Sequence, residues 1–137
     1  MLSNFIQMPG FLKFLTGMAA ICVLSVILSI LPGYIDIFGQ HVSTSEWWSN
    51  GSGSVFAVSL VPIFCSGILM LKRSVYGRVM HIAGWISADI GVLMVAIIND
   101  VKMPHTLAYM YVAFAIAPTI VFAGYLYFGK RARAYFA

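Results

Sequence analysis

The stretch FLTGMAAICVLSVILSILPGYI, residues 14–35, decides the fold of this protein, because its 22 residues include no charged side chain. A helix rises ~1.5 Å per residue, so a run of this length can cross a hydrocarbon core of ~30 Å. Residues 107–128 form a second uncharged run of 22 residues. We predict a transmembrane helix over each run.

Two further apolar runs lie between these helices. Residues 55–71 give 17 uncharged positions, and residues 79–98 give 20 positions interrupted only by His81 and Asp89. Hydrophobic residues make up 61% of the 137-residue chain and charged residues 9%, against roughly 25% charged residues in soluble domains. The sequence therefore predicts an all-α integral membrane protein. Residues 1–137 would form one domain, a four-helix up-down bundle with short loops.

The basic residues predict how the chain is threaded through the membrane. Of the eight Lys and Arg residues, only Lys102 lies on one side of the expected helices. The other seven lie on the opposite side, at Lys13, Lys72, Arg73, Arg78, Lys130, Arg131 and Arg133. Basic residues prefer the cytoplasmic side, so we expect both termini in the cytoplasm, at a bacterial inner membrane. The net charge of +4 then reflects topology, and no nucleic-acid partner is expected.

The segments outside the four helices carry expectations of their own. Residues 1–12 are apolar with a Pro-Gly break, which favours an interfacial segment on the inner leaflet. Residues 129–137 form a basic cytoplasmic tail that anionic headgroups would attract. Residues 36–54 form the outer loop, and residues 39–54 within it are rich in Ser and Gly, which predicts a mobile connection. Trp47 and Trp48 in that loop suggest an aromatic anchor at headgroup level.

Asp89 is the residue that an ordinary lipid-facing helix would not contain. It is the eleventh of the 20 residues in its run, which places it near the bilayer midplane. A charged Asp there costs roughly 2.5–3.5 kcal/mol, and no Lys or Arg lies at the same depth. We therefore expect a neutral Asp89 that seeks a hydrogen-bond acceptor.

Candidate partners for Asp89 lie at or within one turn of the same depth in the other helices, at Ser25, Ser59, Pro62, Ser66, Pro118 and Thr119. Pro62 and Pro118 each remove a helix hydrogen bond, which would free the carbonyls of Val58 and Phe114, and Thr119 adds a hydroxyl. One interpretation is a satisfied polar cluster that fixes helix packing, with the prolines as hinges. The other is a proton or cation site at the centre of the bundle.

His81 and Trp85 lie on the same helix as Asp89, toward the cytoplasm. Eight residues separate His81 from Asp89, which puts them about 80° apart around the helix. A proton path from His81 to Asp89 is one hypothesis, because His titrates near neutral pH. An ordinary interfacial histidine is the alternative.

Small residues predict where helices approach each other closely. They recur at four-residue spacing in the first and third helices, at Ser25, Ser29, Gly33, Gly84, Ser87, Ala88 and Gly91. Such faces close a bundle within one chain or join two chains, and both possibilities stay open.

Two functional classes remain after the motifs are considered. No hydrolase, kinase, phosphate-loop or zinc-protease motif occurs, so no enzyme and no cofactor is expected. His41 and His105 lack a third ligand, so no metal site is expected. The first class is a non-enzymatic protein that binds another membrane protein, or a second copy of itself, as an accessory subunit or bacteriocin-immunity-type protein. The alternative is a minimal proton- or cation-coupled transporter or channel centred on Asp89.

Overall fold

Four long helices dominate the computed structural model, which describes residues 1–102 and 104–137 and, at residue 107, the backbone only. Each is long and apolar enough to cross a membrane, which confirms the four apolar helices predicted from the sequence. In chain order the elements are α1 (Leu2–Gln7), α2 (Gly10–Leu28), β1 (Tyr34–Ile37), β2 (Gln40–Ser43), α3 (Thr44–Ser49), α4 (Ser52–Leu71), α5 (Tyr76–Ile98), α6 (His105–Phe128) and α7 (Lys130–Phe136).

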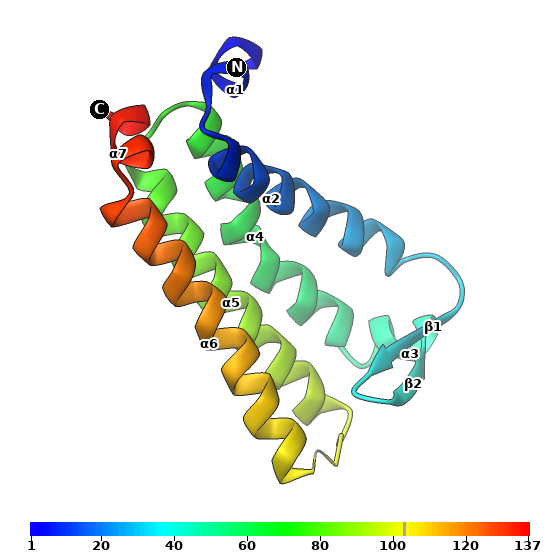
Figure 1. The fold of residues 1–137 in the computed structure, drawn as a ribbon. Coiled ribbons are helices and arrows are strands. Elements are labelled where there is room, and N and C mark those ends of the chain that lie inside the picture. Colours follow the sequence, from blue (N-terminus) through cyan, green and yellow to red (C-terminus); the bar gives the residue numbers. More distant parts are fainter. Residues whose placement is uncertain (103) are drawn as a thin grey trace.

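The long helices are packed more tightly at one end than at the other. Helix α4 packs against α2 and α5, and α6 lies along α5 (Figure 1). Near the two termini, the ring of Phe11 on α2 lies 4.5 Å from the ring of Tyr125 and 6.1 Å from that of Phe122, both on α6. Toward the β-hairpin, α2 and α6 diverge (Figure 1). The ends of α2 and α6 are therefore farther apart at the hairpin than near the termini.

Glycines allow α4 to approach its two neighbours. A Cβ added at Gly84 of α5 would lie 2.6 Å from the backbone nitrogen of Ile63, and one at Gly91 would overlap Ser59. A Cβ at Gly67 of α4 would lie 2.8 Å from the Cβ of Ala19 on α2. Lipid tails are as apolar as side chains, so close backbone contact is what favours helix association in a membrane.

The first spanning helix is shorter than the sequence predicts. It ends at Leu28 and starts at Gly10, so the expected range of 14–35 is wrong at both ends. Residues 10–12, expected in the interfacial segment, belong to the spanning helix; of that segment only α1 is a separate helix. Pro32 removes a backbone donor and favours the break after Ser29. The apolar run then continues as strand β1.

A two-stranded hairpin replaces part of the expected outer loop and departs from the all-α prediction. Strands β1 and β2 are antiparallel, with Tyr34 opposite Ser43. Phe38 and Gly39 connect them, both with positive φ, 52° and 87°, as a two-residue type I′ hairpin requires. Alternate side chains of the hairpin are buried, among them those of Ile37 and Val42. Period-two alternation is the signal of a half-buried strand, and it was hidden at the end of a longer apolar run.

The tryptophans of α3 pack into the protein. Trp47 is only 3% exposed, and its ring lies 5.7 Å from that of Phe56 on α4. Trp48 donates a 2.8 Å hydrogen bond from its indole N–H to the carbonyl of Ser29. The expectation of a mobile loop with both tryptophans in the headgroups is therefore wrong for Trp47. The reason is tertiary, because α4 and the end of α2 offer these rings partners that the loop composition does not reveal.

The C-terminal residues also fold back onto the protein. Residues 129–137, expected as a basic tail, contain helix α7, in which Tyr135 and Phe136 are buried. The Tyr135 hydroxyl lies within hydrogen-bonding distance of the carbonyls of Met70 at 3.2 Å and Asn4 at 3.3 Å. Helix α7 thus joins the N-terminal segment to the end of α4, while its basic side chains remain exposed.

Candidate functional site

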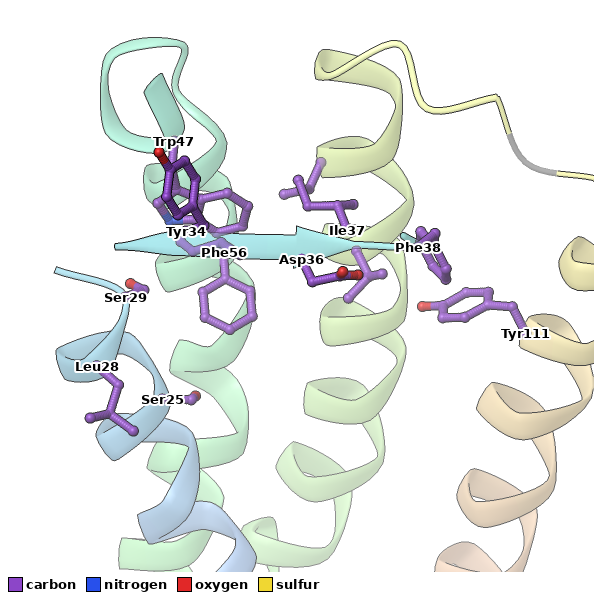
Figure 2. A pocket seen from close by; sticks show the side chains of 13 residues that line it. Ser25, Leu28, Ser29, Tyr34, Asp36, Ile37, Phe38, Trp47, Phe56 and Tyr111 are labelled. Atoms are coloured by element: carbon purple, nitrogen blue, oxygen red, sulfur yellow. The ribbon is translucent and has the colours of Figure 1, made fainter. Parts of the chain in front are cut away.

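A large cavity lies at the hairpin end, where α2 and α6 diverge (Figure 1). Its volume is about 570 Å³, within the ~300–1,000 Å³ typical of ligand sites. Residues from α2, β1, α3, α4, α5 and α6 surround it, namely Ser25, Leu28, Ser29, Tyr34, Ile35, Asp36, Ile37, Phe38, Trp47, Phe56, Val92, Val95 and Tyr111 (Figure 2). We call this space the hairpin cavity.

Strand β1 lies across the hairpin cavity (Figure 2). At its end, the ring of Phe38 meets the ring of Tyr111 edge-on, with centroids 5.5 Å apart and planes at 87°. The Tyr111 hydroxyl in turn donates a 3.2 Å hydrogen bond to the backbone carbonyl of Asp89. A non-glycine residue with positive φ is uncommon, and the contact with Tyr111 accounts for Phe38 at this turn position. The hairpin is thereby attached to α6 and, through it, to α5.

The serine and aspartate side chains of the hairpin cavity are bonded within the chain. The hydroxyls of Ser25 and Ser29 donate to carbonyls three residues earlier in α2, at 2.8 and 2.7 Å. One Asp36 oxygen accepts from the Gly39 N–H at 2.8 Å, and the other lies 3.5 Å from Nδ1 of His41. The indole N–H of Trp47 has no hydrogen-bond partner among the described residues. The rest of the lining is mainly apolar, so the cavity suits apolar groups.

Asp89 lies in a separate recess of about 400 Å³ between α5 and α6. Thr119 lines the same recess, but its hydroxyl donates to the carbonyl of Ala115 at 3.0 Å. Among the described residues, no hydrogen bond involves the Asp89 carboxyl group. The sequence-predicted polar cluster is therefore not formed, although Asp89 and Thr119 are brought into one recess. Thr119 does not bond to Asp89 because its hydroxyl bonds to a carbonyl of its own helix instead.

Both mid-helix prolines lie inside continuous helices. Helix α4 runs through Pro62, and α6 runs through Pro118. In the described part of the chain, no side chain donates to the carbonyls of Val58 and Phe114 that these prolines free. The proposed link between Asp89 and the prolines has no counterpart in this geometry.

His81 is fully buried and belongs to a different group of side chains. The indole N–H of Trp85 donates to Nε2 of His81 at 3.1 Å, and Nδ1 of His81 lies 3.0 Å from the hydroxyl of Ser66. That hydroxyl also donates to the carbonyl of Ile63 at 2.6 Å. Because Nε2 accepts, the neutral ring carries its proton on Nδ1 and donates it to Ser66. Every polar atom of His81 is satisfied in this arrangement.

The predicted relay therefore has its two residues in different surroundings. His81 packs among rings, with its centroid 5.9 Å from that of Phe122, and it does not line the Asp89 recess. Trp85 is bonded to His81 and also does not line that recess. The structure brings His81 together with Trp85, and Asp89 together with Thr119.

The small residues predicted to pack helices together lie in different surroundings. Gly84 and Gly91 face α4 of the same chain, while Ser87 and Ala88 are half-buried. Ser25 and Ser29 line the hairpin cavity instead of a helix contact. Gly33 is exposed and lies beyond the end of α2, so its assignment to a helix-packing face is wrong. The shorter α2 explains this difference.

Sequence reasoning missed the roles of Phe38 and Tyr111. It placed Ser66 near the depth of Asp89 but did not predict its contact with His81. Phe38 precedes a glycine between two alternating segments, which is a hairpin signal. Tyr111 and Ser66 gave no local signal, because their roles depend on contacts 22 and 15 residues away in the chain.

No family model, no curated protein and no solved structure matches this chain. Within residues 1–102 and 104–137, no group of three His, Cys, Asp or Glu side chains is placed to hold a metal ion. The functional argument therefore depends on the geometry of the hairpin cavity and of the Asp89 recess.

Proposed function

We propose that this chain is a small non-enzymatic membrane protein that acts by binding a transmembrane segment of another membrane protein in the hairpin cavity. An accessory subunit of a larger complex and an immunity-type protein are both proteins of this kind, and a second copy of the chain is a possible partner. The observation that supports the proposal is an open, mainly apolar cavity whose serine and aspartate side chains are already bonded within the chain.

The size of the hairpin cavity suits side chains of a helix. A cavity of ~150 Å³ holds one benzene, so about 570 Å³ has room for roughly three groups of that size. An amphipathic helix presents about three anchors at i, i+3 or i+4, and i+7 to a groove.

We further propose that the four helices cross a bacterial inner membrane alternately, with both termini in the cytoplasm. The seven-to-one distribution of basic residues supports this threading. Cysteines placed at Ser74 and Ser49 test it in intact cells with a membrane-impermeant thiol reagent, in a background lacking Cys22 and Cys65. We expect Ser49→Cys to react and Ser74→Cys to be protected; the reverse pattern would show that the orientation is inverted.

Photo-crosslinking tests the binding proposal. A benzophenone side chain at Leu28, which lines the hairpin cavity, is compared with one at Ile27, which does not; both positions are 53% exposed on the same helix. In native membranes we expect Leu28 to capture a transmembrane peptide of one defined protein, and Ile27 to capture lipid. Ser25→Trp, which fills the cavity, should remove the Leu28 product.

Two results would contradict the proposal. One is lipid adducts alone from both positions, and the other is a Leu28 product that is unchanged when Ser25→Trp fills the cavity.

The Asp89 recess favours a second candidate function, a minimal proton- or cation-coupled transporter or channel. Its support is a carboxyl group without a hydrogen bond among the described residues, beside Thr119, near the expected midplane. Against it, the recess has little further polar lining: Tyr111 adds a hydroxyl that is bonded to the backbone carbonyl of Asp89. The other lining residues are aliphatic, namely Ile86, Ile90, Leu93, Val112, Ala115, Ile116 and Ile120.

Flux measurements separate the two candidates. If Asp89 exchanges a proton or cation, Asp89→Asn should abolish flux in proteoliposomes while the protein remains folded. If binding is the function, we expect no flux from either protein and unchanged Leu28 crosslinking in Asp89→Asn. Flux that disappears in a folded Asp89→Asn variant would replace our proposal with the transporter.

A further inference from the structure

The end of the molecule that holds both termini is strongly basic. Seven of the eight Lys and Arg residues flank the helix ends there, and all four acidic residues lie elsewhere, at Asp36, Glu46, Asp89 and Asp100. The charged side chains at this end are therefore all basic. Such an end attracts anions, and the question is whether it holds them at a defined place.

A recess at this end brings together two arginines from distant parts of the chain. Its volume is about 400 Å³, and it is lined by Gln7, Pro9, Arg73, Arg131, Ala134 and Tyr135. Arg73 comes from the link between α4 and α5, and Arg131 comes from α7. Only the folding of α7 against the N-terminal segment places both guanidinium groups on one recess.

Arg73 is held in place by two contacts. It donates a hydrogen bond from Nη2 to Oε1 of Gln7, and its guanidinium carbon lies 5.0 Å from the centre of the Tyr135 ring. A guanidinium group fixed in this way loses less conformational freedom on binding an anion than a mobile lysine does. Arg131 is exposed beside it. Two arginines around one recess suit a phosphate group, because guanidinium donors match phosphate oxygens.

Exposed apolar residues close in sequence to the recess lining favour a lipid as the source of that phosphate. The recess lies where α4 ends and α7 begins, at the level of the ends of the spanning helices. Close by in the chain, Leu2 and Ile6 of α1 are 75% and 66% exposed, and Phe128 at the end of α6 is 81% exposed. A phospholipid can contact the arginines with its headgroup and the exposed apolar residues with its acyl chains.

We propose that the recess between the α4–α5 link, α7 and the N-terminal segment is a binding site for the phosphate of an anionic phospholipid. Arg73 and Arg131 bind the phosphate oxygens, and the exposed apolar residues contact the acyl chains. This site is independent of the partner-binding role of the hairpin cavity at the other end. It differs from general attraction to a charged membrane in holding one lipid at one place.

Native mass spectrometry of the detergent-solubilised full chain tests the proposal by titration with phosphatidylglycerol and with phosphatidylcholine. We expect one phosphatidylglycerol to bind more tightly than further copies do. Phosphatidylcholine, a zwitterion, should bind more weakly. Arg73→Gln with Arg131→Gln should weaken the first phosphatidylglycerol at least about tenfold, because each charge near a headgroup contributes appreciably.

The matched control also removes two positive charges from this end of the molecule, but at positions outside the recess. Lys130→Gln with Arg133→Gln lies on α7 outside the recess and should change the first binding step less than about threefold. Arg131→Gln alone keeps the contacts of Arg73 with Gln7 and Tyr135, so it tests the site even if the double variant unfolds. Equal weakening by both double variants, or an unchanged affinity in Arg131→Gln, would overturn the proposal.

Free phosphate is the other source of the same chemistry. Inorganic phosphate at millimolar concentration should not displace phosphatidylglycerol from the site. Displacement at that concentration, or phosphate binding without lipid binding, would assign the recess to a soluble anion and overturn the lipid assignment.

Discussion

The two ends of this molecule use the same long helices in opposite ways. At the terminal end, buried residues from α2, α4, α6, α7 and the N-terminal segment form one cluster, namely Met8, Leu12, Leu15, Met70, Phe122, Leu126, Tyr135 and Phe136. At the hairpin end the buried cluster is smaller and consists of Ile37, Val42, Trp47 and Val95. Helices α2 and α6 meet through their rings at the first end, whereas β1 lies between them at the second (Figures 1 and 2).

This difference shows which contacts bring the ends of apolar helices together. Spanning helices are apolar on all sides, so hydrophobicity alone does not specify which faces meet. At the terminal end the aromatic rings of Phe11, Phe122 and Tyr125 supply specific contacts between α2 and α6. At the hairpin end a folded loop takes the position that such contacts would occupy. We therefore expect the terminal end, the closed end, to contribute most of the free energy of unfolding. We expect the hairpin end, the open end, to bind the partner.

The largest expected effect comes from opening the closed end. Phe122→Ala removes a ring that lies 5.4 Å from Trp85, 5.9 Å from His81 and 6.1 Å from Phe11. Core Phe-to-Ala changes cost ~3–5 kcal/mol, and lipid entering the gap would reduce this. We expect a loss of about 3 kcal/mol in the free energy of unfolding, measured by denaturant titration in detergent micelles. Phe114→Ala, an exposed ring on the same helix, is the control and should cost less than about 1 kcal/mol.

A somewhat smaller effect should follow from separating α4 and α5, which both ends share. Gly84→Leu forces a side chain against the backbone of Ile63, and overpacking costs ~1–3 kcal/mol. Gly17→Leu is the matched control, because a Cβ at that helix position meets nothing within 4 Å. Thermal unfolding in nanodiscs compares the two variants. If Gly17→Leu is as destabilising as Gly84→Leu, close approach of α4 and α5 is not what holds the helices together.

The smallest effect is expected at the open end, where one hydrogen bond connects α3 to α2. Trp48→Phe removes the donor to the Ser29 carbonyl and should cost ~0.5–1.5 kcal/mol. Faster amide exchange in residues 29–44, with unchanged exchange in α7, is the expected signature. Trp47→Phe is the control, because its indole nitrogen is buried without a hydrogen-bond partner in the described structure. Faster exchange in α7 would show that the two ends are not independent.

Residue type predicted some features of the candidate site but not the contacts between its side chains. Asp89 stood out because a carboxyl group in an apolar run is costly, and Thr119 was placed at its depth by counting residues. Their shared recess agrees with that reasoning. The expected contact between Asp89 and the prolines did not form, and His81 bonded to Ser66 and Trp85. Rotation of one helix relative to its neighbours decides such pairings, and a residue count does not fix that rotation.

The amino-acid sequence by itself determined four helices able to span a membrane and the segregation of basic residues to one end. Both are sums over single residues, because transfer into lipid depends on each side chain and on the local helix. Only the tertiary structure decided that residues 34–49 fold over a cavity, that α7 closes the opposite end and that Arg73 meets the same recess as Arg131. These features depend on contacts between segments far apart in the chain. Their energies arise from shape and packing, which no local stretch of the sequence contains.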